Sequence, residues 1–252
     1  MKALGVAAIV VAALLPSAAA GGNPAAALGV SPLRVELKAG VPSPITVRNP
    51  GAHPIVVTVT RAGFARTLHG KPRIKAARGA AGWLTARPRR LRLAPHKTAS
   101  IHLTAAPPAS ARPGDHPALV LLATRPPANK KVHVLLRVGV VVLVRVPGTI
   151  VHDLVPRALT VHRRGTDRRF ALRLANRGNV AERLRGAHLE LVLTRHGKRF
   201  ATLRARLVDL LPHSAGIAQF TYRGAVRGRV RAAVVLRPAT IGHPRSFRVT
   251  LR

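Results

Sequence analysis

The sequence of 252 residues contains no cysteine, which excludes disulfides, thiolate chemistry and lipid attachment through an N-terminal cysteine. Aromatic residues make up 3% of the chain and hydrophobic residues 47%, so we expect a core built from Val, Leu, Ala and Ile. The shortage of aromatic rings also leaves few side chains on which nucleic-acid bases could stack.

Acidic residues are the second shortage. The chain has only seven, scattered along its length: Glu36, Asp115, Asp153, Asp167, Glu182, Glu190 and Asp209. General acid–base catalysis needs a carboxylate or a histidine held against a partner. The 12 histidines are dispersed, and no GxSxG, HExxH or glycine-rich phosphate loop is present. The closest pairs, His188 with Glu190 and Asp115 with His116, lack a third metal ligand nearby. We therefore expect no enzyme, no catalytic residue, no cofactor and no metal.

Positive charge is abundant, because 43 Lys and Arg give a formal net charge of +36. Residues 28–147 hold 20 Lys and Arg against 2 acids, and residues 148–252 hold 22 against 5, so no basic tail explains the total. Such a chain repels itself and is attracted to polyanions.

Two stretches concentrate this charge. In VRGRVRAAV, alternate arginines would share one face of a strand at steps of about 6.6 Å: Arg227, Arg229 and Arg231. In TARPRRLRL, four arginines crowd one expected strand and its start: Arg87, Arg89, Arg90 and Arg92. One interpretation is a solvated face whose charges protect sheet edges. The other is a polyanion-binding stripe, for which these seven arginines are the candidates.

The N-terminus, MKALGVAAIVVAALLPSAAA, has one charge at Lys2 and an apolar run that ends before Pro16. Small residues follow, which predicts a signal peptide over residues 1–20 with cleavage after Ala20. The alternative is a membrane anchor, but a dozen apolar residues fall short of the roughly 20 that span a bilayer. VHVLLRVGVVVLVRV (132–146) is short, contains two arginines and is rich in valine, which favours a buried strand. We expect a secreted or cell-envelope protein, extracytoplasmic, with no membrane span in the mature chain.

The rest of the chain predicts strands. In RRFALRLAN, Phe170, Leu172 and Leu174 alternate with polar or small residues, as in a strand with one buried face. Asn49-Pro50-Gly51 and Asn176-Arg177-Gly178-Asn179 end similar strands in the two halves, and we expect structural turns there, because Asn and Gly tolerate left-handed conformations. The fold class is all-β, with two tandem immunoglobulin-like β-sandwich domains at residues 28–147 and 150–252.

Several motifs of residues 28–147 carry a family resemblance: GVSPLRVEL, ITVRNPGAHPIVVTVT and WLTARPRRLRLAPHKTASIHLTAAPPASARPGDHPALVLLAT. They resemble the N-terminal domain of the WxL-interacting protein family and, more distantly, that of periplasmic pilus chaperones. Residues 150–252, with LANRGN and DLLPHS, look like the family's second immunoglobulin-like domain. The resemblance implies peptidoglycan binding by the first domain and a host or partner protein for the second. Members usually end in a transmembrane helix, whereas this sequence stops at Leu251-Arg252, so we do not expect that anchor.

The more distant resemblance implies different site residues. Pilus chaperones hold the C-terminal carboxylate of a subunit with one basic residue on the first strand and another on the last strand of domain one. Arg34 and Arg137 occupy such positions, and the long apolar strand would suit β-augmentation.

Three functions follow, in order of preference. The first is a non-catalytic binding or scaffolding protein of the cell envelope that contacts peptidoglycan or anionic cell-wall polymers. The alternative is a chaperone-like assembly protein that binds surface or pilus subunits by strand complementation. Nucleic-acid binding comes last, because the export signal places the chain away from the chromosome and no nucleic-acid module is recognisable.

Overall fold

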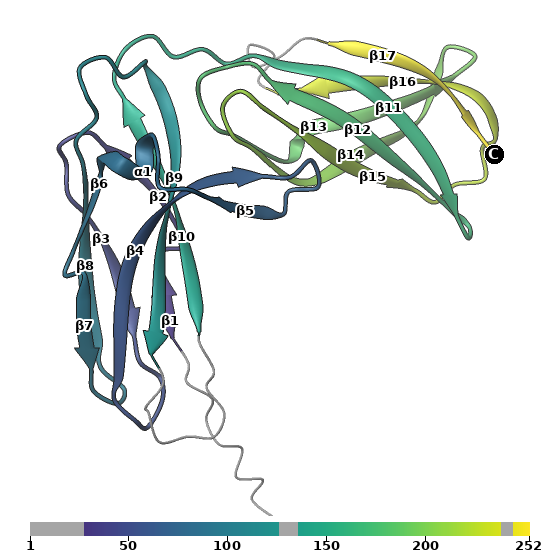
Figure 1. The fold of residues 1–252 in the computed structure, drawn as a ribbon. Coiled ribbons are helices and arrows are strands. Elements are labelled where there is room, and N and C mark those ends of the chain that lie inside the picture. The colour runs from purple at the N-terminus through teal and green to yellow at the C-terminus, as the bar shows by residue number, and fades with distance from the viewer. Residues whose placement is uncertain (1–27, 126–135, 238–243) are drawn as a thin grey trace, which may run out of the picture.

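The computed structural model describes residues 28–125, 136–237 and 244–252 (Figure 1). The predicted signal peptide, residues 1–20, lies outside the described residues, as do the first four residues of the valine-rich stretch. The described chain is nearly all strand, which confirms the prediction of an all-β fold with immunoglobulin-like sandwiches. No helix in these ranges is long and apolar enough to cross a membrane.

The first domain, β1 to β10, packs two sheets against each other. One sheet has the order β1-β3-β8-β6 and consists of β1 (Gly29–Ser31), β3 (Ser43–Arg48), β8 (Thr98–Ala105) and β6 (Leu84–Arg87). The other has the order β2-β10-β9-β4-β5, and its strands are β2 (Arg34–Lys38), β10 (Arg137–Val146), β9 (Gly114–Arg125), β4 (Ile55–Arg66) and β5 (Pro72–Lys75). Strand β7 (Arg90–Leu93) also pairs with β4, and one short helix, α1 (Ala80–Trp83), precedes β6.

The second domain, β11 to β17, is a smaller sandwich of the same kind. Its first sheet has the order β11-β12-β15, with β11 (Leu154–Arg164), β12 (Asp167–Asn176) and β15 (Ser214–Tyr222). Its second sheet has the order β14-β13-β16-β17, with β14 (Lys198–Leu210), β13 (Glu182–Arg195), β16 (Gly228–Leu236) and β17 (Arg245–Leu251). The predicted domain boundaries at 147 and 150 fall between β10 and β11, and they stay predictions.

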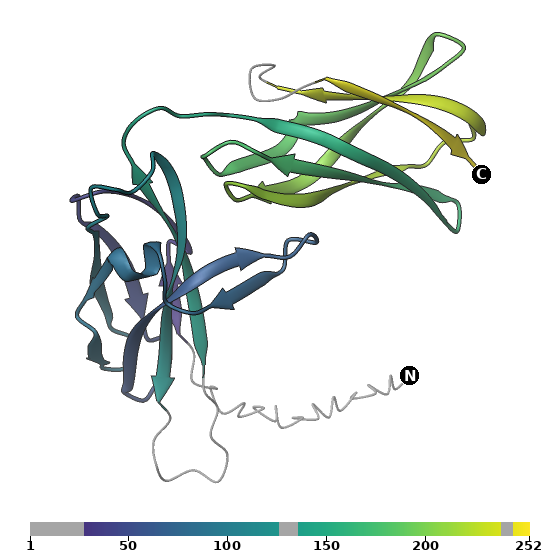
Figure 2. The ribbon, with the colours of Figure 1, turned by 45° about the horizontal axis from the view of Figure 1, so that its top comes forward.

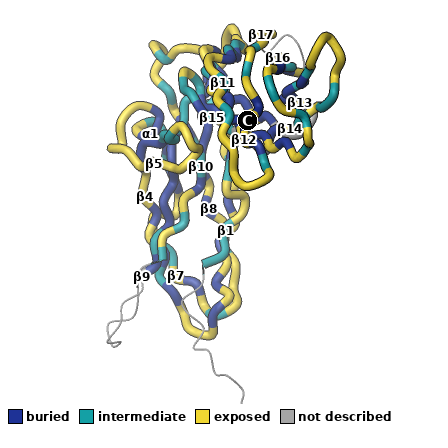
Figure 3. Tube along the Cα trace, turned by 90° about the vertical axis from the view of Figure 1, so that its right-hand side faces the viewer, coloured by how far each residue is buried: buried dark blue, intermediate teal, exposed yellow. Residues whose placement is uncertain are grey.

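Each sandwich has its own apolar core, and buried positions line the interior of both (Figure 3). On β12 the predicted alternation is observed, because Phe170, Leu172 and Leu174 are fully buried whereas Arg169 and Arg173 are exposed. Burying one face of each strand stabilises the fold by about 25 cal/mol for each Å² of apolar surface that is removed from water.

The aromatic residues are divided between the two cores. Trp83 packs against the first core, and its ring meets that of His116 edge-on at 4.9 Å between centroids. Tyr222 is buried in the second core, where its ring meets Phe200 edge-on at 5.6 Å. Its hydroxyl accepts a hydrogen bond from the backbone N–H of Val226.

The Asn-Pro-Gly break after β3 is held by its asparagine side chain. Asn49 is fully buried, and its Nδ2 lies within hydrogen-bond distance of the carbonyl oxygens of His53, Leu93 and Ala94, at 2.8, 3.2 and 3.1 Å. Its Oδ1 accepts the N–H of Gly51 at 3.0 Å. The amide therefore ties the end of β3 to a distant turn.

The second break repeats this arrangement. Asn176 donates from Nδ2 to the carbonyl oxygens of Val180 (2.7 Å) and Leu211 (3.1 Å), and its Oδ1 accepts the N–H of Gly178 at 3.0 Å. Among the described residues, neither asparagine and neither paired glycine has a positive φ. The turns therefore form without the left-handed conformations that these residue types tolerate. Each asparagine forms an Asx turn, in which the side chain bonds the backbone two residues on.

The two domains meet at an angle and are joined by more than the linker (Figures 1 and 2). The hairpin of β4 and β5 reaches from the first domain to β15, where the N–H of Ile217 donates to the carbonyl of Leu68 at 2.9 Å. A third apolar cluster adds Leu211 of the second domain to five residues of the first: Ala62, Phe64, Leu119, Leu121 and Leu143.

Asn179 joins three segments at this junction. Its Nδ2 donates to the carbonyl oxygens of Pro113 and Thr149, at 3.1 and 2.8 Å, and its Oδ1 accepts the N–H of Val151 at 2.7 Å. Its own carbonyl accepts the N–H of Asp115 at 2.7 Å. The second break thus also positions the linker between the domains.

Candidate functional site

The edge of β10 is only half covered. β10 pairs with β9 along its whole length, from Arg137 to Val146. β2 covers its other side in parallel, but only from Val141 onwards. Upstream of β2 the chain crosses to the other sheet, where β1 pairs with β3. Among the residues that the structure describes, residues 137–140 of β10 are therefore paired on one side alone.

The backbone groups at this open edge can be assigned. The N–H of Val141 donates to the carbonyl of Leu33 at 2.9 Å and so points towards the β2 side. Because backbone direction alternates along a strand, the N–H and C=O groups of Arg137 and Gly139 point to the same side. Leu33, which is 57% exposed, lies next to them. An extended peptide could add to such an edge through main-chain hydrogen bonds.

Two arginines and one aspartate meet where this edge reaches β2. The Nη1 atom of Arg34 is 2.9 Å from both carboxylate oxygens of Asp209, and Nη2 of Arg66 is 3.0 Å from Oδ2. Arg34 and Arg66 belong to the first domain and Asp209, on β14, belongs to the second. We call these three residues the carboxylate corner.

The carboxylate corner gathers two guanidinium groups around the carboxylate of Asp209. The three side chains are between 13% and 26% exposed, and Arg34 also lies 3.9 Å from the exposed carboxylate of Glu36. The Nε atom of Arg66 is buried without a hydrogen-bond partner in the described structure. The two guanidinium groups of the corner could bind a second carboxylate that joins or replaces Asp209.

The structure places the two predicted anchor arginines on one sheet but not opposite each other. Arg34 is the register partner of Val141, four residues after Arg137 on β10, which corresponds to about 13 Å along the strand. Joint anchoring of one carboxylate by Arg34 and Arg137 stays a prediction. Sequence reasoning missed Arg66, because the meeting of β4 with β14 has no local signal in either segment.

A second ion pair, between Asp115 and Arg145 of the first domain, lies at the junction of the two domains. Asp115 accepts hydrogen bonds from Nε and, at 3.0 Å, Nη2 of Arg145, and from the N–H of Ala181 in the second domain at 2.9 Å. The Asp115 side chain is 1% exposed. Its hydrogen bond raises the pKa of Arg145, while burial of the guanidinium lowers that pKa by less.

Nearby, Nδ1 of His152 lies 2.5 Å from the Glu182 carboxylate. Several of the scattered acids thus have structural partners. No group of three potential metal ligands occurs within the described ranges.

The predicted polyanion-binding arginines are all exposed, but they do not form two simple stripes. Arg229 and Arg231 lie on β16, whereas Arg227 precedes it. The other group is split between strands of different sheets. Arg87 ends β6, and Arg90 and Arg92 lie on β7, which pairs with β4. A polyanion-binding role for these residues and for Arg89 stays a prediction.

Comparison with known proteins gives a likeness of fold. No family model and no curated protein matches the chain. It is similar to a chain of a chaperone–tip adhesin complex of CFA/I fimbriae, with 12% identity, a TM-score of 0.52, and coverage of 90% of this chain and 99% of that one. The class 5 fimbriae chaperone CfaA has 11% identity, the same coverages and a TM-score of 0.49. A chain of the Salmonella enterica SafA pilin–SafB chaperone complex has 14% identity, a TM-score of 0.46 and coverages of 90% and 97%.

These comparisons correct the sequence-based function. They give no support to the resemblance to WxL-interacting proteins. The expectation of a protein that contacts peptidoglycan or anionic cell-wall polymers is wrong, because the matching structure with a TM-score of 0.52 is a chain of a fimbrial chaperone–tip adhesin complex. They agree better with the alternative of a chaperone-like assembly protein. At such low sequence identities the structural similarity shows a shared fold alone.

Proposed function

We propose that this chain is an exported, non-catalytic, chaperone-like protein that holds an extended segment of a surface or pilus-like subunit by strand addition. The observation that carries the proposal is the open edge of β10 over residues 137–140, which runs directly into the carboxylate corner. The predicted signal peptide supports an extracytoplasmic location. The fold shared with a chain of a chaperone–tip adhesin complex supports a subunit as the partner.

The bound segment occupies the row that β2 leaves empty. It runs parallel to β10, as β2 does, and pairs with the backbone groups of Arg137 and Gly139. Its C-terminus then arrives at Arg34, beside the exposed Leu33. A terminal carboxylate there either joins Asp209 or replaces it on Arg34 and Arg66. Main-chain pairing supplies affinity for many sequences, and the corner fixes the register of the segment.

A proline substitution tests the edge. Arg137→Pro removes one N–H donor from the open side, where proline is tolerated in a strand, and Arg137→Ala keeps the donor but removes the charge. The partner is first captured by crosslinking from the exported proteins of the source cells, and its affinity is then measured by calorimetry. Arg137→Pro should weaken binding about tenfold or more, since a bound carbonyl loses its donor.

Arg137→Ala separates backbone pairing from anchoring. An affinity close to that of the unmodified chain is the result expected from strand addition. Equal affinity of the proline and alanine variants, at any level, would contradict pairing through this N–H. A loss that is as large in Arg137→Ala would assign the effect to the side chain.

Removal of Asp209 tests the corner. Asp209→Ala frees Arg34 and Arg66 from their internal carboxylate, so a peptide with the partner's C-terminal sequence should bind about tenfold more tightly. The same peptide with an amidated C-terminus is the matched control and should gain little. If both peptides change equally, the corner does not recognise a terminal carboxylate.

A further inference from the structure

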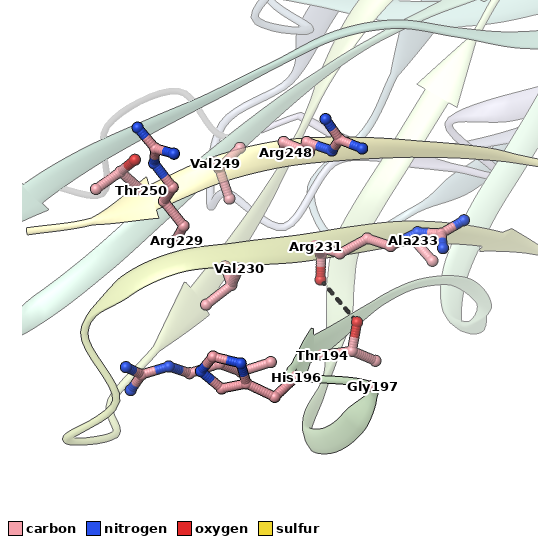
Figure 4. A pocket seen from close by; sticks show the side chains of 11 residues that line it. Thr194, His196, Gly197, Arg229, Val230, Arg231, Ala233, Arg248, Val249 and Thr250 are labelled. Atoms are coloured by element: carbon pink, nitrogen blue, oxygen red, sulfur yellow. Dashed lines mark hydrogen bonds between the residues drawn. The ribbon is translucent and has the colours of Figure 1, made fainter.

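A second cationic site lies at the far end of the second domain. β13 and β14 run from the junction, where Glu182 and Leu210 pair, to a hairpin turn at residues 195–198. Residues 228–230, at the start of β16, do not pair with β13, because that pairing begins at Arg231. On its other side β16 pairs with β17 from Gly228 onwards. A hollow of about 730 Å³ opens there (Figure 4). We call it the arginine hollow, and six of its lining residues are Thr194, His196, Arg229, Arg231, Arg248 and Thr250.

The strand register brings like charges together in the arginine hollow. Arg231 on β16 lies directly opposite Arg248 on β17, and Arg229, two residues away, lies opposite Thr250. Figure 4 shows these three arginine side chains projecting from the two strands. Cβ atoms of directly opposed residues are about 4.5–5.5 Å apart, and like charges at such positions destabilise the pairing.

No carboxylate offsets this repulsion. None of the ion pairs of the described residues includes Arg229, Arg231 or Arg248. At the other end of the same sheet, Glu190 pairs with Arg204 at 3.4 Å and with Arg237 at 3.2 Å. The arginine hollow therefore keeps charge that its surroundings leave uncompensated.

In another pair of arginines that are opposed in register, one guanidinium is held by hydrogen-bond acceptors. Arg163 and Arg168 are register partners on β11 and β12. The guanidinium of Arg168 donates to three carbonyl oxygens, those of Thr166, Gly224 and Arg252. In the described structure the guanidinium groups of Arg231 and Arg248 have no such acceptors. Their opposition is the kind that a bound anion would relieve.

We infer that the arginine hollow binds the phosphate group of an anionic ligand. Guanidinium groups meet phosphate oxygens bidentately, and a dianion between opposed arginines replaces repulsion by two attractions. The hydroxyl of Thr250 lines the same hollow and can donate a further hydrogen bond, whereas that of Thr194 donates to the carbonyl of Arg231 at 3.5 Å. The phosphate belongs either to a small soluble ligand or to a phospholipid headgroup. This site is separate from β10 and does not depend on the proposed chaperone function.

The test uses the mature chain and inorganic phosphate, titrated against chloride at constant ionic strength. The hollow variant, Arg231→Gln with Arg248→Gln, removes the opposed pair. The β12 variant, Arg169→Gln with Arg173→Gln, removes two exposed arginines from β12 and so has the same net charge as the hollow variant. Phosphate at about 100 times its Kd should raise the Tm of the unmodified chain and of the β12 variant by about 5 °C or more. The hollow variant should show no shift, and without phosphate its Tm should equal or exceed that of the unmodified chain.

A further variant fills the arginine hollow from within. Thr194 is the register partner of Arg231, so Thr194→Glu places a carboxylate beside it. This variant should raise the Tm without phosphate and abolish the phosphate response. A phosphate shift that persists in both hollow variants would overturn the proposal and leave only a diffuse field of positive charge.

Vesicles distinguish the two sources of phosphate. Sedimentation with vesicles of 30% phosphatidylglycerol in phosphatidylcholine compares the hollow variant with the β12 variant. A lipid headgroup is identified by two results together: the hollow variant alone loses binding to the vesicles, and added phosphate releases the unmodified chain from them. A phosphate-dependent Tm shift with equal sedimentation of both variants identifies a small soluble ligand.

Discussion

Asp115→Ala should lower the free energy of unfolding by about 3 kcal/mol, because it leaves the N–H of Ala181 and the partly buried guanidinium of Arg145 without their acceptor. The Asp115 side chain is 1% exposed, and it accepts hydrogen bonds from Arg145 and from the N–H of Ala181 in the other domain. The substitution thus removes an ion pair within the first domain and a link between domains. Urea unfolding of the mature chain, followed by circular dichroism, measures the loss.

Glu36→Ala is the matched control for this prediction. The Glu36 side chain is 65% exposed and lies 3.9 Å from Arg34, so its removal should cost no more than about 0.5 kcal/mol. Similar losses in the two variants would mean that Asp115 acts only through the net charge of the chain. A loss confined to Asp115→Ala supports a specific buried pair.

Asn176→Ala should cost about 3 kcal/mol. The substitution leaves the carbonyls of Val180 and Leu211 and the N–H of Gly178 without their partner, and an unsatisfied buried group costs about 1–3 kcal/mol. Thermal unfolding compared with the unmodified chain measures the effect. Asn176→Asp should be similarly damaging, because it keeps the acceptor for Gly178 but turns a carboxylate towards two carbonyl oxygens.

Gln219→Ala provides the control for the loss of an amide. Gln219 is exposed on β15 of the same domain, so its truncation should change stability by less than about 0.5 kcal/mol. If Asn176→Ala were as mild as Gln219→Ala, the Asx turn would be a consequence of the fold and would contribute little to its stability.

The sequence predicted best what depends on neighbours along the chain. Alternation at Phe170, Leu172 and Leu174 identifies a strand because the side chains of a strand alternate in direction within a few residues. The two Asn-Gly breaks were predicted as turns for a related reason. The partners of the two asparagines were not predicted, because the amides of Asn49 and Asn176 bind carbonyls that are up to 45 and 35 residues away.

The candidate sites depend on contacts that no local pattern encodes. Arg34 and Asp209 are 175 residues apart and meet only because the second domain folds back on the first. Arg248 belongs with Arg231 because of the register between β16 and β17, which single-sequence periodicity does not determine. Arg227 drops out of the predicted stripe because β16 begins after it, at Gly228, where φ is +90°.

The division of the aromatic residues gives each sandwich its own optical label. Trp83 is the only tryptophan and packs on the first core, and Tyr222 is the only tyrosine and is buried in the second. Excitation at wavelengths that tyrosine does not absorb therefore reports on the first sandwich alone. Near-ultraviolet circular dichroism contains bands of both Trp83 and Tyr222, so a change in it that the tryptophan fluorescence does not share reports on the second sandwich. Loss of one signal before the other would show directly whether the domains unfold together, without any label attached to the chain.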